Sequence, residues 1–437
     1  MKKVIVFFII IIMSMPMVTI GTASAGDDIV LPPPSTTTMN LEETIWRRAS
    51  IRNFTKDPIS DQDLSTILWA AYGIRGDGSR TVPTINGLYA VKIYVVRQEA
   101  VYTYDPANNT LVFYKTGDYR FIGQYEAPLL LGFVWDQNIS TDGDLAAAQM
   151  GMIGQNVHFM VNALGMGTVV NGDFSPTYTL ERIGLPDNEV PRIIMPIGYL
   201  VFPYNFKDLP VWISFLPKVQ RSTSSLSDAL EARNETNAWE GELSRKETIQ
   251  MLWSSYGYSY YVDQSDFGFI YHISRHRTVP SAHGYYVLRI YAVTEDGTYE
   301  YIPNIYNPLY GPLRLIYLLP KFPFPVVTYL KKINDQDQRA AIADASESPA
   351  IATAPMITVI ILDLEQARIG RDDFSGEEWW WLWYYEVGSA AQNMLLESAA
   401  WDLSTNIVLP TDAAAIRSTL GLNESYVPTM IVPVGNP

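Results

Sequence analysis

The chain has 437 residues, 48% hydrophobic and 18% charged, which is typical of a globular protein long enough for two ordinary domains. Its formal net charge of −15 argues against a nucleic-acid partner, because phosphate backbones are bound by basic surfaces. Cysteine is absent, which excludes disulfides, thiolate metal sites and thiol nucleophiles.

The N-terminal segment has the sequence pattern of an export signal followed by a linker. Two lysines precede an apolar run at residues 4–20, and Ala23 and Ala25 form an A-x-A cleavage pattern. We expect a signal peptide over residues 1–25, or an uncleaved membrane anchor, since the run approaches the length of a spanning helix. Both alternatives place the rest of the chain outside the cell or at its surface. Residues 26–39, with three consecutive prolines, predict a stiff exposed linker.

From residue 40 the sequence predicts alternating helices and strands. Asn40 followed by Glu43 predicts a helix start, and "SDQDLSTILWAAYG" is typical of an amphipathic helix that ends at Gly73. The runs "LYAVKIYVV", "LLLGFVW" and "PRIIMPIGYL" predict strands, and "AAAQMGMIGQNVHFMVNALGMG" predicts a long buried helix. Hairpins separated by helices indicate an α+β core.

The same order of motifs occurs twice along the chain. "RTVPTINGLYAVKIYVV" at residues 80–96 recurs as "RTVPSAHGYYVLRIYAV" at residues 277–293, with nine identical positions. The "QN" helix and the final "P-x-x-x-x-P-x-G" strand also recur. We therefore predict a tandem duplication with repeat 1 over residues 40–215, a linker over 216–228 and a degenerate repeat 2 over 229–437.

The segment "RRASIRNF" at residues 47–54 is the first candidate binding site. If the chain extends after the first helix, Arg48, Ser50 and Arg52 alternate onto one side. Two guanidinium groups around a hydroxyl suit a phosphate dianion. The alternative is a solvated basic patch, which is the commoner case for a bare arginine cluster. His272 and His276 have helical spacing but no glutamate between them, so we expect no metal site.

Taken together, the motifs resemble the FMN-dependent nitroreductase family, and within it the branch that contains azoline-oxidising dehydrogenases. The resemblance rests on "RRASIRNF", "LWAAYG", the "TVP" turn before "GLY", the "QN" helix and "PRIIMPIG". It implies a nitroreductase-like α+β fold of antiparallel-rich sheets flanked by helices. Members of this family form intertwined homodimers with FMN at the interface. Here the two tandem copies would form an intramolecular pseudo-dimer within one chain.

The resemblance also assigns candidate FMN ligands. The phosphate and ribityl end would lie at Arg48, Ser50 and Arg52. Backbone beside the flavin ring would come from Val170, Asn171, Gly172 and Asp173, because glycine permits close approach and N–H donors stabilise a reduced flavin. The other half would supply a turn formed by Pro280, Ser281, Ala282 and His283. No side-chain acid or base is assigned, since the flavin carries the chemistry.

The two implied sites are not equivalent. Aligned through the tryptophan of the "LW" motif, the phosphate cluster falls on Ala232, Asn234 and Thr236, with Glu231 and Glu235 beside them. Carboxylates there would repel a phosphate by roughly several kcal/mol at an effective dielectric of about 20. The glycine run "GMGTVVNGDF" is replaced by "DLSTNIVLPT". We therefore expect one FMN per chain, at the interface of repeats 1 and 2.

The leading hypothesis is an exported FMN-dependent oxidoreductase that transfers hydride or electrons through flavin N5 to an organic acceptor. Its partners would be a small-molecule electron donor and acceptor. The alternative is a degenerate, non-catalytic flavin-binding or cell-surface binding module, because a phosphate cluster indicates cofactor binding but not turnover. The apolar insertion at residues 306–330 fits a lid, contact with a membrane surface, or ordinary core packing.

Overall fold

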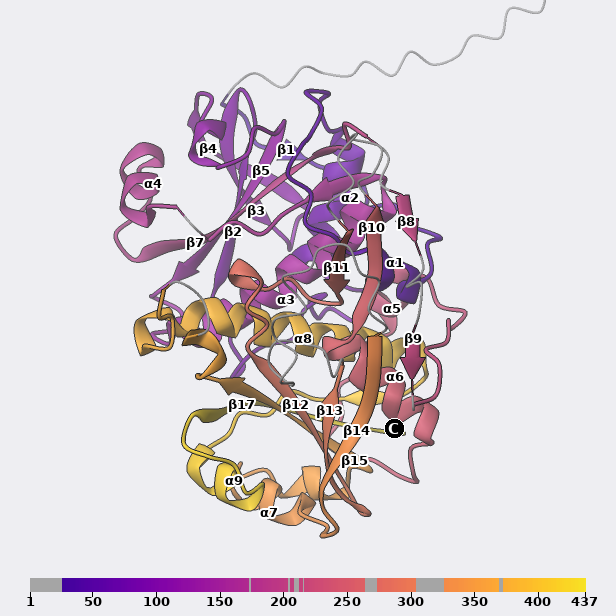
Figure 1. The fold of residues 1–437 in the computed structure, drawn as a ribbon. Helices are drawn as coiled ribbons and strands as arrows, with labels where there is room; N and C mark the ends of the chain where they lie inside the picture. Colours follow the sequence, from indigo (N-terminus) through magenta and orange to yellow (C-terminus); the bar gives the residue numbers. More distant parts are fainter. Residues whose placement is uncertain are drawn as a thin grey trace, which may run out of the picture.

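The computed structural model describes residues 26–172, 174–202, 205–207, 212–214, 216–263, 273–303, 326–368 and 372–437. Two α+β halves lie one above the other in Figure 1, the first in violet and the second in orange and yellow. Between them the long helices α3 (Gly143–Ala163) and α8 (Trp380–Ala400) lie side by side. The predicted signal peptide and residues 306–325 of the apolar insertion lie outside the described residues.

The first half is a seven-stranded antiparallel sheet with helices. Its strand order is β1 (Ile29–Val30), β4 (Thr110–Thr116), β3 (Ala100–Asp105), β2 (Val91–Val96), β5 (Leu129–Asp136), β7 (Glu189–Tyr199) and β6 (Met166–Thr168). In addition to α3, this half contains the helices α1 (Leu41–Arg47), α2 (Asp61–Tyr72) and α4 (Pro176–Ile183), with a short 3-10 helix η1 (Arg120–Ile122).

The second half repeats this architecture. Its sheet has the order β16 (Ser404–Thr405), β17 (Tyr426–Gly435), β15 (Met356–Asp363), β12 (Leu288–Thr294), β13 (Gly297–Ile302), β14 (Val326–Asn334) and β9 (Trp212–Ser214). Its helices are α5 (Leu226–Ala232), α6 (Arg245–Tyr256), α7 (Arg339–Asp344), α9 (Ala413–Thr419) and the 3-10 helices η3 (Ala282–Gly284), η5 (Pro349–Thr353), η6 (Gln366–Arg368) and η7 (Glu377–Trp379). A small sheet has the order β11 (Ile273–Arg277), β10 (Tyr258–Asp263) and β8 (Asn205–Lys207). The predicted α+β class and its tandem repetition are confirmed.

Local chemistry explains the helix ends that the two halves share. The Asn40 side chain accepts the amide of Glu43 at the start of α1, and Ser225 with Asp228 forms a capping box at the start of α5. Helix α2 ends at Gly73, where an added Cβ would lie 2.6 Å from Trp69. The glycine after α6, Gly257, occupies the same position, so the repeated "LW-x-x-YG" motif encodes a helix end folded back onto its own tryptophan.

Small residues allow α3 and α8 to cross closely. Gly151 and Gly388 each lie four residues before the glutamine of their "QN" motif. A Cβ added at Gly151 would lie 1.9 Å from the carbonyl oxygen of Tyr385, and one added at Gly388 would lie 1.8 Å from that of Ala148. The backbones of α3 and α8 are therefore in direct contact at the centre of the molecule, which only glycine allows at these two positions.

The glutamine and asparagine of each "QN" motif tie the two halves together. Gln155 Nε2 donates to the carbonyl of Thr278 and to Asn393 Oδ1, both at 2.8 Å. Gln392 Nε2 correspondingly donates to the carbonyl of Thr81 at 3.2 Å and to Asn156 Oδ1 at 3.0 Å. These buried bonds end on the threonine of the "RTVP" motif in the opposite half, so the repeated sequence forms a repeated interface.

Two boundaries differ from the prediction. Residues 26–39 are mostly exposed, as predicted for a linker, but they are attached to the fold, because β1 pairs with β4 and Leu31 is buried in the core. The amide of Thr37 also donates to the Ser227 hydroxyl at 2.9 Å, which attaches this segment to the second half. Strands β8 and β9, placed in repeat 1 by the sequence, pair with β10 and β14 of the second half.

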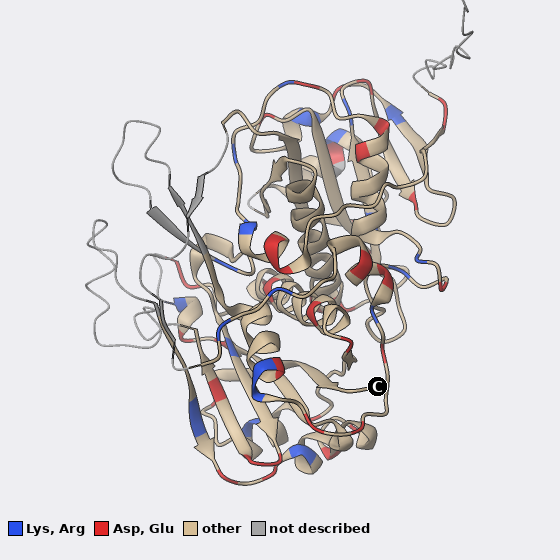
Figure 2. Cartoon of the chain, turned by 90° about the vertical axis from the view of Figure 1, so that its right-hand side faces the viewer, with Lys and Arg blue, Asp and Glu red and all other residues tan. Residues whose placement is uncertain are grey.

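Acidic and basic residues are interspersed along the chain in both halves, as Figure 2 shows. Among the helices of the described residues, none combines the length and the apolar character needed to cross a bilayer.

Candidate functional site

A cavity of about 280 Å³ lies where the two halves meet, and both halves line it. The first half contributes residues that follow α1, η1 and β6, together with one residue of β7: Ser50, Arg52, Gln124, Tyr125, Val169, Val170, Asn171, Gly172 and Ile193. The second half contributes the turn after β11 and one stretch of α8: Pro280, Ser281, Ala282, His283, Leu382, Tyr385 and Glu386.

The structure brings nine of the eleven candidate residues together around this cavity, from three separate parts of the sequence. Ser50 and Arg52 lie with Val170, Asn171 and Gly172, and the turn of Pro280, Ser281, Ala282 and His283 faces them from the other half. Arg48 does not line the cavity, and Asp173 lies outside the described residues.

Backbone pairing within the first half assembles its side of the cavity. The amide of Ile51 donates to the carbonyl of Thr168 at 2.8 Å, which places the chain after α1 beside the end of β6. Asn171 exchanges two backbone hydrogen bonds with Ile194 of β7, at 3.0 and 2.8 Å. At Gly172 an added Cβ would lie only 3.2 Å from the indole of Trp381, so a helix of the other half approaches closely here.

The turn from the second half is held by its own hydrogen bond and by aromatic contacts. The amide of Tyr286 donates to the Ser281 hydroxyl at 2.7 Å. His283 has a φ of 52°, a left-handed conformation that is uncommon for histidine, and its ring stacks on Phe374 with centroids 5.1 Å apart. The same position in the first half is Asn86, also with a φ of 52°, where asparagine before glycine is the ordinary choice.

Arg48 is buried and, contrary to the predicted alternation, does not share one exposed side of the chain with Ser50 and Arg52. Its assignment to the FMN phosphate stays a prediction. Arg48 forms the C-cap of α1 and is only 2% exposed, and its Nε donates to the carbonyl of Arg277 at 3.0 Å. The alternation argument failed because the chain turns inward at the cap before it extends. Burial lowers the pKa of this guanidinium, and its Nη1 has no hydrogen-bond partner among the described residues.

The alignment of the second half was also wrong by one residue. Arg48 lies eight residues after the N-cap Asn40, and Arg233 lies eight residues after the N-cap Ser225. Arg233 is likewise a buried C-cap, and its guanidinium donates to the carbonyl of Thr81 at 3.1 Å. In this register the counterpart of Arg48 is therefore Arg233 and not Ala232. The counterparts of Ser50 and Arg52 become Glu235 and Asn237.

These counterparts have hydrogen-bond or ion-pair partners within the second half. Glu235 pairs with Arg233 Nη2 at 3.0 Å. Asn237 Oδ1 accepts from Asn406 at 2.6 Å, and Asn406 directly follows β16 as Val169 follows β6. A carboxylate replaces the cavity serine and an amide replaces the cavity arginine. With the corrected alignment we therefore still expect the second half not to bind a phosphate at these positions.

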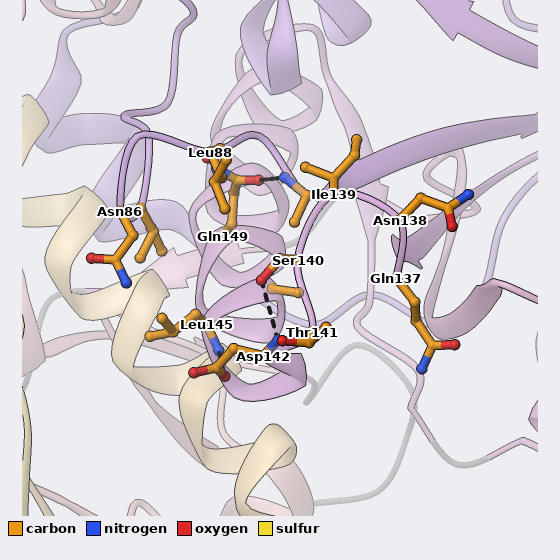
Figure 3. A pocket seen from close by; sticks show the side chains of 13 residues that line it. Asn86, Leu88, Gln137, Asn138, Ile139, Ser140, Thr141, Asp142, Leu145 and Gln149 are labelled. Atoms are coloured by element: carbon orange, nitrogen blue, oxygen red, sulfur yellow. Dashed lines mark hydrogen bonds between the residues drawn. The ribbon is translucent and has the colours of Figure 1, made fainter.

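A second cavity, of about 360 Å³, lies within the first half (Figure 3). It includes Asn86 and Gln149, the counterparts of His283 and Glu386, but its remaining lining comes from the loop after β5 and from neighbouring residues of the same half. Gln149 accepts the amide of Ala90 at 2.9 Å there. Because its lining residues all belong to one half, this cavity is not a second copy of the interface cavity.

The sequence reasoning missed Glu386. This residue is 1% exposed, and burial raises its pKa to about 7, against the opposing effects of the Ser281 and Tyr256 hydroxyls and the charge of Arg277. The sequence contained an indication of this residue, because a carboxyl group is unusual within an apolar helix such as this part of α8. Its relation to the cavity depends on the tertiary structure and could not be read from spacing.

A family profile described as "Nitroreductase family" matches residues 45–199 and 260–436. A protein of Methanocaldococcus jannaschii, described as a candidate nitroreductase, is 29% identical over 182 residues, covering 37% of this chain and 91% of that protein. A crystal structure of a candidate nitroreductase from Anabaena variabilis covers 94% of both chains with a TM-score of 0.64 at 15% identity. One from Ralstonia eutropha is 29% identical, with a TM-score of 0.39, and covers 41% of this chain and 93% of that chain. The Anabaena structure therefore shares the duplicated fold over 94% of its length, and the Methanocaldococcus protein corresponds in length to a single half.

Proposed function

The chain belongs to the nitroreductase family of oxidoreductases, and from this premise we propose that it binds one FMN in the interface cavity and transfers electrons to an organic acceptor. The observation that carries the proposal is the cavity itself. Residues that the family resemblance assigns to FMN converge on it from both halves, while the counterparts in the second half have partners within that half.

The chain's own groups fit a flavin phosphate and ring. Arg52 is exposed at the cavity and its Nη1 bonds only the carbonyl of Ser50 among the described residues, at 3.2 Å, so its guanidinium can turn to an anion. Arg48 adds a buried cationic group behind Ser50, with its Nη1 unsatisfied in the described chain. The segment 170–172 offers backbone where a flat ring could lie. Asp173, which the family resemblance assigns to the same stretch of backbone, stays part of the proposal.

Each part of the cavity has a separate task in this proposal. Bound FMN would supply the hydride and electron transfer. Ser50 and Arg52 would hold the phosphate end, and the turn at residues 280–283 would cover the ring from the other half. Leu382 and Tyr385 of α8 form part of the cavity wall from the second half. The cavity volume of about 280 Å³ lies at the lower end for small-molecule sites.

We also propose that the protein is exported and works on small-molecule donors and acceptors outside the cytoplasm. This part rests on the lysines, the apolar run and the A-x-A pattern at residues 1–25. The second candidate function, a flavin-binding protein without turnover, is distinguished by the reduction of an added acceptor.

The test is the visible spectrum of the purified full chain after incubation with FMN. We expect about one FMN per chain, and Arg52→Ala should weaken FMN binding by about tenfold or more, because a charge-assisted hydrogen bond contributes about 1.5–3 kcal/mol. Asn237→Ala is the matched control, since it alters the counterpart position in the second half and should leave FMN affinity unchanged. A chain that cannot be loaded, or that binds two FMN, contradicts the proposal.

A further inference from the structure

Glu386 is a buried carboxyl group on the wall of the interface cavity. It belongs to α8, and its Oε1 accepts the hydroxyl of Tyr256 from α6. The Tyr256 oxygen itself accepts the amide of Leu288 at 3.1 Å. That amide fixes the hydroxyl in place, so its proton is directed at the carboxyl group. Glu386 Oε2 makes no hydrogen bond of ordinary geometry with the described residues.

The duplication provides an internal comparison for this carboxyl group. Gln149 lies six residues before the glutamine of its "QN" motif, as Glu386 does. Its Oε1 accepts the Tyr72 hydroxyl at 3.1 Å, and its amide nitrogen donates to the carbonyl of Leu88 at 3.1 Å. An amide therefore fulfils the structural role at this position. The half that supplies α8 to the interface cavity has instead a group that can exchange a proton.

The surroundings of Glu386 bring its pKa close to neutral pH. Arg277 of β11 lies 4.6 Å from the Tyr256 ring and 4.4 Å from the Tyr286 ring, and its charge favours the carboxylate. Burial opposes ionisation more strongly, so the pKa rises to about 7. Arg52 and His283 line the same cavity. Both forms of Glu386 are therefore populated at neutral pH, which suits a general acid.

We propose that Glu386 is the proton donor to an organic acceptor that is reduced in this cavity. The inference rests on the proposed function, which supplies a hydride from reduced flavin. An acceptor that gains a hydride needs one proton to become neutral. The O–H bond of Glu386 breaks, the proton passes to a heteroatom of the acceptor, and the electron pair stays on the carboxylate. The hydroxyls of Tyr256 and Ser281 stabilise that carboxylate until solvent returns the proton.

The test compares Glu386→Gln with Glu397→Gln, a second buried glutamate of the same helix that does not line the cavity. FMN-loaded full chains are reduced with dithionite and mixed with 1,4-benzoquinone. We expect the reoxidation rate of the control and of the wild type to fall about tenfold per pH unit above roughly pH 7. The rate of Glu386→Gln should be independent of pH and about 100-fold below the wild-type rate at pH values under about 7. The amide at Gln149 indicates that the variant can fold.

A second measurement does not depend on turnover. The infrared band of protonated carboxyl groups in the FMN-free protein should titrate near neutral pH in the wild type and in Glu397→Gln, and Glu386→Gln should remove that component. If all three proteins bind FMN but Glu386→Gln follows the wild-type rate at every pH, or if it removes no titrating band, the inference is overturned and the proposed function stands. If the wild type cannot be loaded with FMN, the proposed function fails and the inference falls with it.

Discussion

The crossing of α3 and α8 predicts that Gly388→Ala will damage the interface between the halves. The added Cβ would lie 1.8 Å from the carbonyl oxygen of Ala148 and 2.6 Å from its carbonyl carbon. Carbon and oxygen atoms that are not bonded normally approach to about 3.3 Å, so the helices would have to separate by roughly 1.5 Å. Neither atom belongs to a flexible side chain that could turn away. The same separation would also loosen the counterpart contact at Gly151.

The expected cost follows from two opposing effects. Overpacking a core typically costs about 1–3 kcal/mol, and a contact between two backbones belongs at the upper end or beyond. Replacing glycine by alanine within a helix returns about 1 kcal/mol. We therefore expect the free energy of unfolding to fall by at least about 2 kcal/mol.

Urea unfolding followed by tryptophan fluorescence measures this change. The control is Gly132→Ala in β5, where the new Cβ would lie 3.6 Å from Tyr94, an ordinary van der Waals distance. That variant should stay within about 1 kcal/mol of the wild type. If Gly388→Ala unfolds with the wild-type midpoint and slope, the close crossing of α3 and α8 is not required, and the reasoning is refuted.

Three further predictions concern buried polar groups. Burial and the neighbouring Glu42 raise the pKa of Glu397 above its ordinary value of 4.5, so the wild type loses stability as the pH rises from there through the folded-state pKa. Glu397→Gln should remove that loss, seen as a larger gain in melting temperature at pH 8 than at pH 5. Arg289→Leu should cost about 3–5 kcal/mol in denaturant unfolding, because it leaves two carboxylates that are each 2% exposed without their closest cation. Gln392→Ala should cost about 1–3 kcal/mol, because it removes the donor to the buried Oδ1 of Asn156, and an unchanged midpoint would contradict the role of the "QN" motif.

Much of the fold could be predicted because its determinants are local. A side-chain cap at Asn40, a helix-ending Gly73 and runs of β-branched residues each act within a few residues, and each element formed as expected. The duplication then confirmed the assignments by repeating them in order. The attachment of residues 26–39 to the fold was missed for the opposite reason, since their contacts with β4 and with Ser227 come from residues remote in sequence.

The two differences at the site, in the register of the second half and in the placement of Arg48, have separate causes. The second half was aligned by counting back from a tryptophan through a loop. The N-caps Asn40 and Ser60 are separated by one residue more than the N-caps Ser225 and Ser244, so the count slipped by one. Arg48 was misplaced because a helix cap turns the chain, and the direction of that turn depends on what the cap packs against.

The corrected register also separates residues that maintain the fold from residues that distinguish the halves. Positions identical in both copies, such as the glutamines of "QN" and the threonines of "RTVP", bind one half to the other. Positions around the interface cavity differ in the two copies: Ser50 is equivalent to Glu235, Arg52 to Asn237, and Glu386 to Gln149. If both halves had the same role, the cavity residues would be expected to be identical in the two copies, as the interface residues are. The second "RTVPSAH" turn lies at the cavity with serine and histidine where the first has threonine and asparagine, so the repeated motif preserves the interface while its variable residues shape one site.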